Sequence, residues 1–110
     1  MGTIRASREI DRVFKTAKRT SNPLLIVLTE HTPEERGHEG RVAFIAGKRL
    51  GGSVFRNRSR RVLREAVRRA GGPWPKWDVI IIARPGTAFA TVDALDVALA
   101  SLLVRAGVVK

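Results

Sequence analysis

The side chains best suited to chemistry in this sequence are arginines, and they are concentrated between residues 48 and 69. This segment of 22 residues carries nine Lys and Arg side chains and a single acid, Glu65. Arginine donates planar, bidentate hydrogen bonds to phosphate, whereas a merely solvated helix face usually mixes acids with its bases. So dense a run of arginine with so few acids indicates contact with nucleic acid. The residues predicted to make this contact are Lys48, Arg49, Arg56, Asn57, Arg58, Arg60, Arg61, Arg64 and Arg68.

The chain as a whole is strongly basic, but its charge is local. It has 110 residues, with 21 Lys and Arg against 10 Asp and Glu, a formal net charge of +11 and a pI near 11.7. The segment from 48 to 69 supplies +8 of that charge. A docking element explains this distribution better than general solubility does, because a uniformly basic surface would spread the charge.

Length and composition favour a small domain that works in a reducing compartment. The length is that of one domain, so we expect residues 1–110 to form a single unit, and a 44% hydrophobic content is enough for a core. The absence of cysteine excludes a disulfide-linked partner, a thiolate nucleophile and a cysteine-based metal site. Apolar runs such as Val79 to Ala83 are far shorter than the roughly 20 residues of a membrane span, and the first 20 residues lack the apolar centre of a signal peptide. We therefore expect a cytoplasmic protein with no membrane partner.

The glycines near the basic segment do not form a nucleotide-hydrolysis motif. Such a motif needs Ser or Thr after its Gly-Lys pair, but Gly47-Lys48 is followed by Arg49, and Val42 stands where an earlier Gly is required. The pair Gly51-Gly52 either exposes backbone N–H groups to a phosphate or simply forms a turn. Both readings of that pair remain open.

The other candidates for metal or acid–base chemistry share one loop. His31 and His38 lie there with Glu34, Glu35 and Glu39, but the composition is typical of a solvated loop rather than an ordered ligand set. The remaining carboxylates show no pair with the spacing of a general acid and base. We expect no catalytic residue and no metal site on the protein.

Hydrophobic periodicity defines the elements that must position the arginines. Helical spacing over residues 7–19, through the basic segment and from Thr91 to Gly107 predicts three helices. The apolar stripe of the basic helix consists of Val62, Leu63, Ala66, Val67 and Ala70. The apolar runs 24–29, 41–46 and 78–83 predict strands, the first two paired as an antiparallel hairpin.

These elements predict an α+β fold, a two-layer α/β sandwich in which helices cover a small sheet. The expected order is α-β-β-(β)-α-β-α, in which a further short strand before the basic helix is optional. Residues 41–83 would form a β-α-β crossover, and the general rule predicts that such a crossover is right-handed.

The basic segment also resembles a known signature. Lys48 to Gly51, Val54 to Arg61 and Leu63 to Glu65 are closely similar to the RNR signature of the bacterial ribonuclease P protein subunit. The resemblance extends over most of the chain, through Ile10, Val13 and Phe14 in the first helix and the strand from Asp78 to Pro85. It implies a left-handed β-α-β crossover, which we adopt in place of the right-handed rule.

The resemblance implies a function in which RNA is the catalyst. The protein would be the non-catalytic subunit of a ribonucleoprotein endonuclease that removes 5′ leaders from precursor tRNA. Its partners would be the catalytic RNA subunit, on which the helix around Arg56 to Arg58 docks, and precursor tRNA with its single-stranded leader. Mg²⁺ would act through the RNA and the substrate, with no site on the protein.

The resemblance also implies a leader-binding cleft between the first helix and the sheet, with Ile10 and Phe14 as its residues. Ile10 replaces an aromatic residue that is common in the family, so apolar contact would replace stacking there. Phe14 has helical spacing that fits a core residue nearly as well as a leader contact. Ser59 stands at a position that is usually apolar in the family, and we expect a modest change of packing.

Four further aromatic residues lie outside the predicted contact sites. Trp74 and Trp77 flank prolines and are typical of a packed loop, whereas Phe44 and Phe55 face either the cleft or the interior.

Two other functions are compared with this one. A ribosomal or ribosome-assembly protein would be equally basic, but it would not enhance cleavage of precursor tRNA. An autonomous nuclease would need a carboxylate metal cluster that the sequence does not display.

Overall fold

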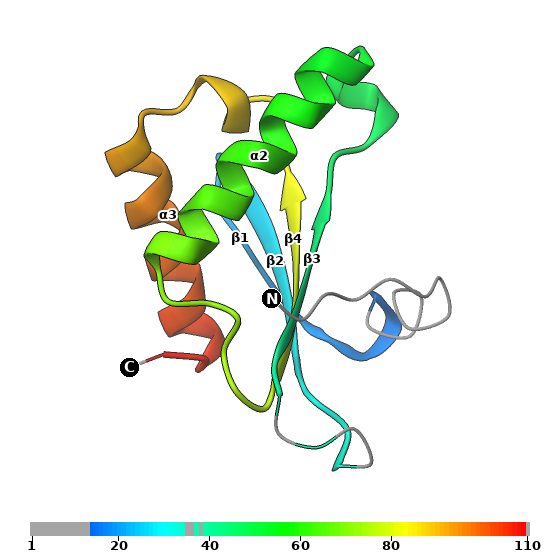
Figure 1. Ribbon diagram of the computed structural model, residues 1–110, viewed down its shortest axis with the longest axis vertical. Coiled ribbons are helices and arrows are strands. Elements are labelled where there is room, and N and C mark those ends of the chain that lie inside the picture. Colours follow the sequence, from blue (N-terminus) through cyan, green and yellow to red (C-terminus); the bar gives the residue numbers. More distant parts are fainter. Residues whose placement is uncertain (1–13, 35–36, 38, 110) are drawn as a thin grey trace.

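The computed structural model describes residues 14–34, 37 and 39–109 of the chain. Within these residues four strands form one sheet, and two long helices pack against it (Figure 1). The strands are β1 (Lys18–Ser21), β2 (Leu25–His31), β3 (Arg41–Ile45) and β4 (Trp77–Ala83). The helices are α2 (Ser53–Arg69) and α3 (Val92–Ala106), each preceded by a short 3-10 turn, η2 (Lys48–Leu50) and η3 (Thr87–Phe89).

The sheet has the strand order β1-β2-β4-β3, with β4 antiparallel to β2 and parallel to β3. The unit β3-α2-β4 is therefore the predicted β-α-β crossover. Figure 1 shows α2 in front of the sheet, both strands of the unit pointing upward, and β4 to the left of β3. This arrangement is left-handed, so the hand implied by the resemblance is confirmed and the general right-handed rule does not hold here.

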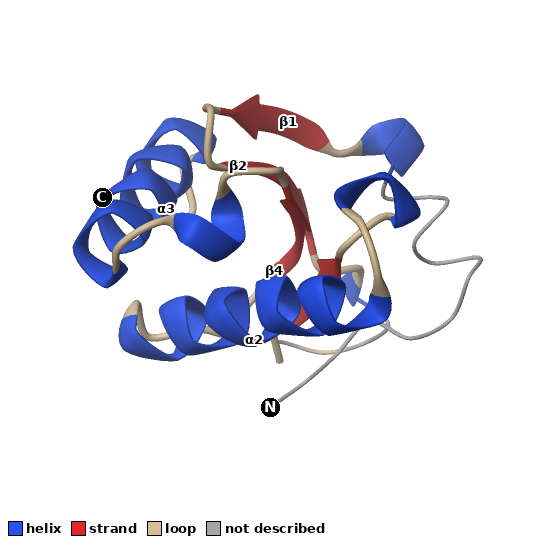
Figure 2. Cartoon of the chain, turned by 90° about the horizontal axis from the view of Figure 1, so that it is seen from above, coloured by secondary structure: helices blue, strands red, loops and turns tan. Residues whose placement is uncertain are grey.

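Side chains of the central strand alternate between two apolar layers. Val79 and Ile81 point into the layer beneath α2 and α3, whereas Ile80 and Ile82 belong to the opposite face of the sheet. Figure 2 shows both helices on the same side of the sheet. The predicted α+β sandwich is confirmed, and the unbroken apolar run of β4 follows from its burial on both faces.

The predicted hairpin between 24–29 and 41–46 is wrong. β4 lies between β2 and β3, so these two strands do not pair. The physical reason is that β4 is fully buried from Val79 to Ile81 and takes the centre of the sheet, where both of its faces and both of its edges are covered. The hairpin instead joins β2 to the short strand β1, which was not predicted at that place.

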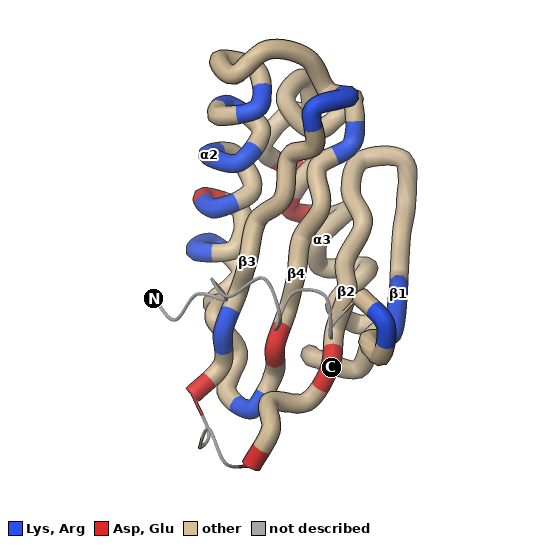
Figure 3. Tube along the Cα trace, turned by 90° about the vertical axis from the view of Figure 1, so that its right-hand side faces the viewer, with Lys and Arg blue, Asp and Glu red and all other residues tan. Residues whose placement is uncertain are grey.

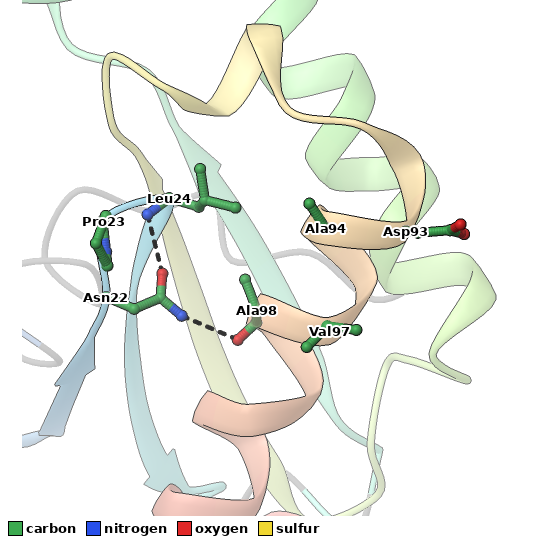
Figure 4. Close-up of a pocket in the computed structure, with 7 residues that line it drawn as sticks. All are labelled: Asn22, Pro23, Leu24, Asp93, Ala94, Val97 and Ala98. Carbon is green, nitrogen blue, oxygen red and sulfur yellow. Dashed lines mark hydrogen bonds between the residues drawn. The ribbon is translucent and has the colours of Figure 1, made fainter.

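Asn22 closes the turn of this β1–β2 hairpin and ties it to α3 (Figure 4). Its Oδ1 accepts hydrogen bonds from the backbone N–H groups of Leu24 and Leu25, at 3.0 and 3.1 Å. Its Nδ2 donates to the carbonyl oxygen of Ala98 at 3.2 Å. Asn favours turns because its short side chain can replace backbone hydrogen bonds, and one residue here fixes both the turn and its distance from α3.

The predicted first helix ends earlier than residue 19. Residues 14–16 are helical, but Lys18 and Arg19 lie in β1, paired with Thr29 and Leu28 of β2. The earlier part of that prediction, including Ile10, lies outside the described residues. No helix in the described ranges has the length and apolar character of a membrane span.

The limits of the two long helices agree with the glycine and threonine signals. Gly51 has a φ of +125° just before α2, and Gly71 has a φ of +91° just after it, conformations that favour glycine. The Thr91 hydroxyl accepts a hydrogen bond from the Ala94 N–H at the start of α3, and Gly107 ends that helix in the left-handed region. The basic helix is thus fixed in length by its flanking residues.

Candidate nucleic-acid interface

The outer face of α2 presents the predicted basic residues to solvent. The helix buries Leu63, Ala66 and Val67 of the predicted stripe against the sheet, together with Ser59, while Val62 is half-buried and Ala70 is exposed beyond the last turn. Side chains on the opposite side are exposed because the helix repeats every 3.6 residues. These exposed residues are Asn57, Arg58, Arg61, Arg64 and Arg68. Figure 3 shows the basic positions of α2 as a column along one edge of the molecule.

Carboxylates neutralise little of this face. In the described part of the chain, Arg69 is the only cation of the segment 48–69 with an ion pair: its Nη2 lies 2.8 Å from Oδ1 of Asp96 on α3. The hydrogen bonds with Asp96 raise the pKa of Arg69 above its ordinary value. Arg69 is not one of the predicted contact residues. Its ion pair with Asp96 therefore distinguishes it, as a structural arginine, from the arginines of α2 that can bind a polyanion.

Three other features distinguish Arg56, Arg60 and Arg64 from the remaining arginines of α2. Arg60 donates a hydrogen bond to the Asn57 side chain, and the guanidinium carbon of Arg64 lies 5.5 Å from the centre of the Phe44 ring. Arg56 is half-buried, and its Nε has no hydrogen-bond partner among the described residues. The contacts of Arg60 and Arg64 restrict the rotamers of these two side chains before any partner binds.

A groove on the other face of the sheet carries a second group of cations. It encloses about 730 Å³. Its apolar floor includes Ile26, Ile45 and Ile82, which belong to the layer opposite α2 and α3. The lining residues that bear positive charge are Arg19, Lys48, Arg49 and Arg84. We call this feature the sheet groove.

The structure therefore divides the predicted contact residues between two surfaces. Lys48 and Arg49 line the sheet groove, whereas the predicted residues from 56 to 68 lie on α2. The sequence does not identify Arg19 and Arg84 as groove residues, because only the pairing of the strands brings them to the same face as Lys48 and Arg49. The unbroken apolar run from Val79 to Ile82 was the available signal that β4 has a second apolar face, because successive side chains of a strand point to opposite faces.

The two predicted leader-binding residues have different outcomes. Ile10 lies outside the described residues. Phe14 is 49% exposed, so it is not a buried core residue, and it does not line the sheet groove. Its role in leader binding stays a prediction.

The remaining aromatic residues are placed by the structure. Trp74 is buried in the layer under the helices, as predicted for a packed loop, and Trp77 is partly buried with its ring centre 4.1 Å from that of His31. Phe44 packs against the helix-side layer and not in the groove. Phe55 is half-buried at the start of α2, with its ring against Phe89.

Ser59 is fully buried in α2 at the position where the resemblance implies an apolar residue. Its hydroxyl donates to the carbonyl oxygen of Phe55 at 3.0 Å, one turn earlier in the helix. This bond satisfies the buried hydroxyl without a partner outside the helix. The hydroxyl is therefore accommodated within the helix, and the modest change of packing stays a prediction.

The buried carboxylate of Asp78, near the start of β4, has a structural role. Asp78 is fully buried and accepts hydrogen bonds from Thr32 Oγ1 at 2.9 Å and from Arg41 Nη2 at 2.7 Å. Across residues 14–34, 37 and 39–109, no three His, Asp or Glu side chains converge in a way that could hold a metal ion. Glu35 and His38 of the predicted loop lie outside these ranges.

Comparisons with known proteins agree with this architecture. A solved structure of the Staphylococcus aureus RNase P protein superposes with a TM-score of 0.84 at 24% identity, covering 100% of this chain and 99% of that one. The RNase P protein of Thermotoga maritima gives a TM-score of 0.78 at 24% identity, over 96% of this chain and 97% of that one. At these identities the likeness establishes the fold.

Sequence relatives extend the agreement to the family. The ribonuclease P protein component of Brevibacillus brevis is 32% identical over 97% of this chain and 84% of its own length. That of Roseiflexus castenholzii is 37% identical over 97% of this chain and 87% of its own length. The family model described as Ribonuclease P matches residues 2–107. With a family match of this length and relatives that align over 97% of the chain, the chain belongs to the ribonuclease P protein family.

Proposed function

We propose that this chain is the protein subunit of a ribonuclease P in which RNA is the catalyst. In this proposal it binds the RNA subunit through α2 and the single-stranded 5′ leader of precursor tRNA through the sheet groove. The observation that carries the proposal is the presence of two cationic surfaces, one on α2 and one on the opposite face of the sheet. Two RNA elements can thus be bound by one small domain.

The α2 surface suits a structured RNA. Its exposed arginines lie on a rigid helix, at spacings set by the helical repeat, and Arg58, Arg61 and Arg68 have no carboxylate partner among the described residues. Folded RNA presents phosphates and shape rather than readable base edges, and guanidinium groups bind phosphates bidentately. The helix would therefore recognise the RNA subunit mainly through its backbone.

The sheet groove suits a single strand. Its floor of isoleucines offers apolar contact to unstacked bases, and Arg19, Lys48, Arg49 and Arg84 can neutralise the phosphates of the same strand. Isoleucine side chains offer no hydrogen bonds to base edges, so binding would depend little on the leader sequence. Such tolerance is required of a protein that handles many precursor tRNAs.

Phosphodiester hydrolysis is assigned to the RNA. The carboxylates of the described residues are dispersed, and the fully buried Asp78 is engaged by Arg41 and Thr32. This donor set does not fit a catalytic Mg²⁺ site, so Mg²⁺ would be held by the RNA subunit and the substrate. The protein would contribute binding energy and orientation, and its place of work would be the cytoplasm, where the bacterial substrate is found.

Cleavage of a 5′-extended precursor tRNA by the RNA subunit of the same organism, with and without the protein at low Mg²⁺, tests the proposal. We expect the protein to increase cleavage at the mature 5′ end and to lower the Mg²⁺ requirement. Tight binding to the RNA subunit without any increase in cleavage would contradict the proposal and favour a ribosome-associated role.

A further inference from the structure

We propose that Phe89 and Phe55 form a stacking site for one unpaired base of the RNA subunit, beside the first turn of α2. This site rests on the proposed function, because it needs an RNA bound to the α2 surface. It adds an aromatic contact to a surface that otherwise binds through charge.

Phe89 is exposed, but the turn that carries it is anchored. Its side chain is 78% exposed, while its neighbours in η3, Thr87 and Ala88, are 0% and 3% exposed. The Thr87 hydroxyl accepts from the Arg84 N–H at 2.8 Å and donates to the carbonyl oxygen of Leu24 at 2.5 Å. The backbone thus holds an apolar ring in water at a fixed place, which is a pre-organised binding element.

Phe55 supports this ring from the side of α2. The two ring centres lie 5.4 Å apart with the planes tilted by 42°, a geometry typical of aromatic pairs. Phe55 is half-buried and belongs to the first turn of α2, and η3 lies against that helix (Figure 1). Phe55 therefore restrains Phe89, and most of the Phe89 surface remains open to a ligand.

Arginines share the first turns of α2 with Phe55. Arg58 is three residues after Phe55 and therefore neighbours it on the helix surface. Arg58 and Arg61 line a surface hollow of about 360 Å³ together with Asn57 and with Val54, which is 85% exposed. An exposed ring packed on the helix turn that carries Arg58, which has no carboxylate partner among the described residues, suits a nucleotide: the base would stack on the ring and a phosphate of the same strand would reach the cation.

Charge selects RNA over a second copy of the chain as the occupant. Two copies meeting at this place would bring together two segments of +8, with one acid in each. The RNA subunit is favoured over the leader because Phe55 belongs to α2 and η3 packs against that helix, whereas the sheet groove opens on the other face of the sheet. Phenylalanine has no hydrogen-bonding group, so the stacked base would be chosen by its being unpaired rather than by its identity.

The test measures the affinity of the full RNA subunit for wild-type protein and Phe89→Ala at several salt concentrations. One lost stacking contact predicts at least about fivefold weaker binding with an unchanged dependence on salt, and Phe89→Trp should retain the affinity. Val97→Ala is the control, because Val97 is an exposed apolar residue on α3 (70% exposed) outside the proposed site. It should bind the RNA subunit as the wild type does. Chemical probing of the RNA should show one unpaired nucleotide that wild-type protein protects and Phe89→Ala does not.

Each other outcome overturns the site in a distinct way. If Arg58→Ala weakens binding and Phe89→Ala does not, the stacking site is wrong and the proposed function survives. If neither substitution changes RNA-subunit affinity, the proposed function fails with it. A defect of Phe89→Ala that appears only with long leaders would assign the ring to the leader, and a change in sedimentation of the free protein would assign it to self-association.

Discussion

Replacing Arg58 with alanine should weaken RNA binding in a way that depends on salt, whereas replacing Arg69 should not. Arg58 is exposed on α2 without a carboxylate partner among the described residues, while Asp96 engages Arg69 at 2.8 Å. Each phosphate contact adds about 0.9 to the slope of log affinity against log salt, because binding releases condensed counterions. Arg58→Ala should therefore lower that slope by about 0.9 if the side chain contacts one phosphate.

This change of slope predicts a measurable difference in affinity. Between about 0.05 and 0.2 M salt, a slope lower by about 0.9 makes the ratio of the variant Kd to the wild-type Kd fall by about 3.5-fold. Fluorescence anisotropy of the labelled RNA subunit, titrated with Arg58→Ala, Arg69→Ala and wild type across that range, gives both slopes. An unchanged slope for Arg58→Ala, or an equal loss for Arg69→Ala, would refute the assignment of the unpaired arginines to RNA.

Four further substitutions test the fold and the binding of the leader. Asn22→Ala should lower the free energy of unfolding by about 1–2 kcal/mol, measured by urea denaturation, because it removes the side-chain bonds that fix the hairpin turn; an unchanged midpoint would contradict that role. Asp78→Asn should cost about 3 kcal/mol or more, since Arg41 loses its buried partner, and a smaller loss would show that the pair is dispensable. Arg84→Ala and Phe14→Ala should weaken binding of precursor tRNA with a long leader and leave RNA-subunit affinity unchanged; loss of stability alone would count against a leader contact at either residue.

The sequence predicts the two long helices and the central strand well, because their signals are local. Gly51 and Gly71 mark the ends of α2 by their conformations, and Thr91 caps α3 with its own side chain. The apolar run from Val79 to Ala83 also predicts β4, because a strand covered on both faces has no polar alternation.

Strand pairing and the sheet groove could not be obtained in this way. Whether β2 pairs with β3 or with β4 depends on contacts between distant residues, and the hydrophobic pattern of each strand is compatible with either partner. Arg19 and Arg84 meet at the groove only because β1 and β4 flank β2 in the sheet. The left-handed crossover likewise followed from the resemblance and not from the pattern of residues.

The most direct test of the two-surface account is a leader-length series measured with surface-specific variants. Binding of precursor tRNAs with no leader, a short leader and a long leader is compared for the wild-type holoenzyme and for holoenzymes carrying Arg84→Ala or Arg58→Ala, assembled at saturating protein. The account predicts that wild-type affinity rises with leader length, that Arg84→Ala removes this rise, and that Arg58→Ala keeps it once the RNA subunit is saturated. A wild-type affinity independent of leader length would contradict the account.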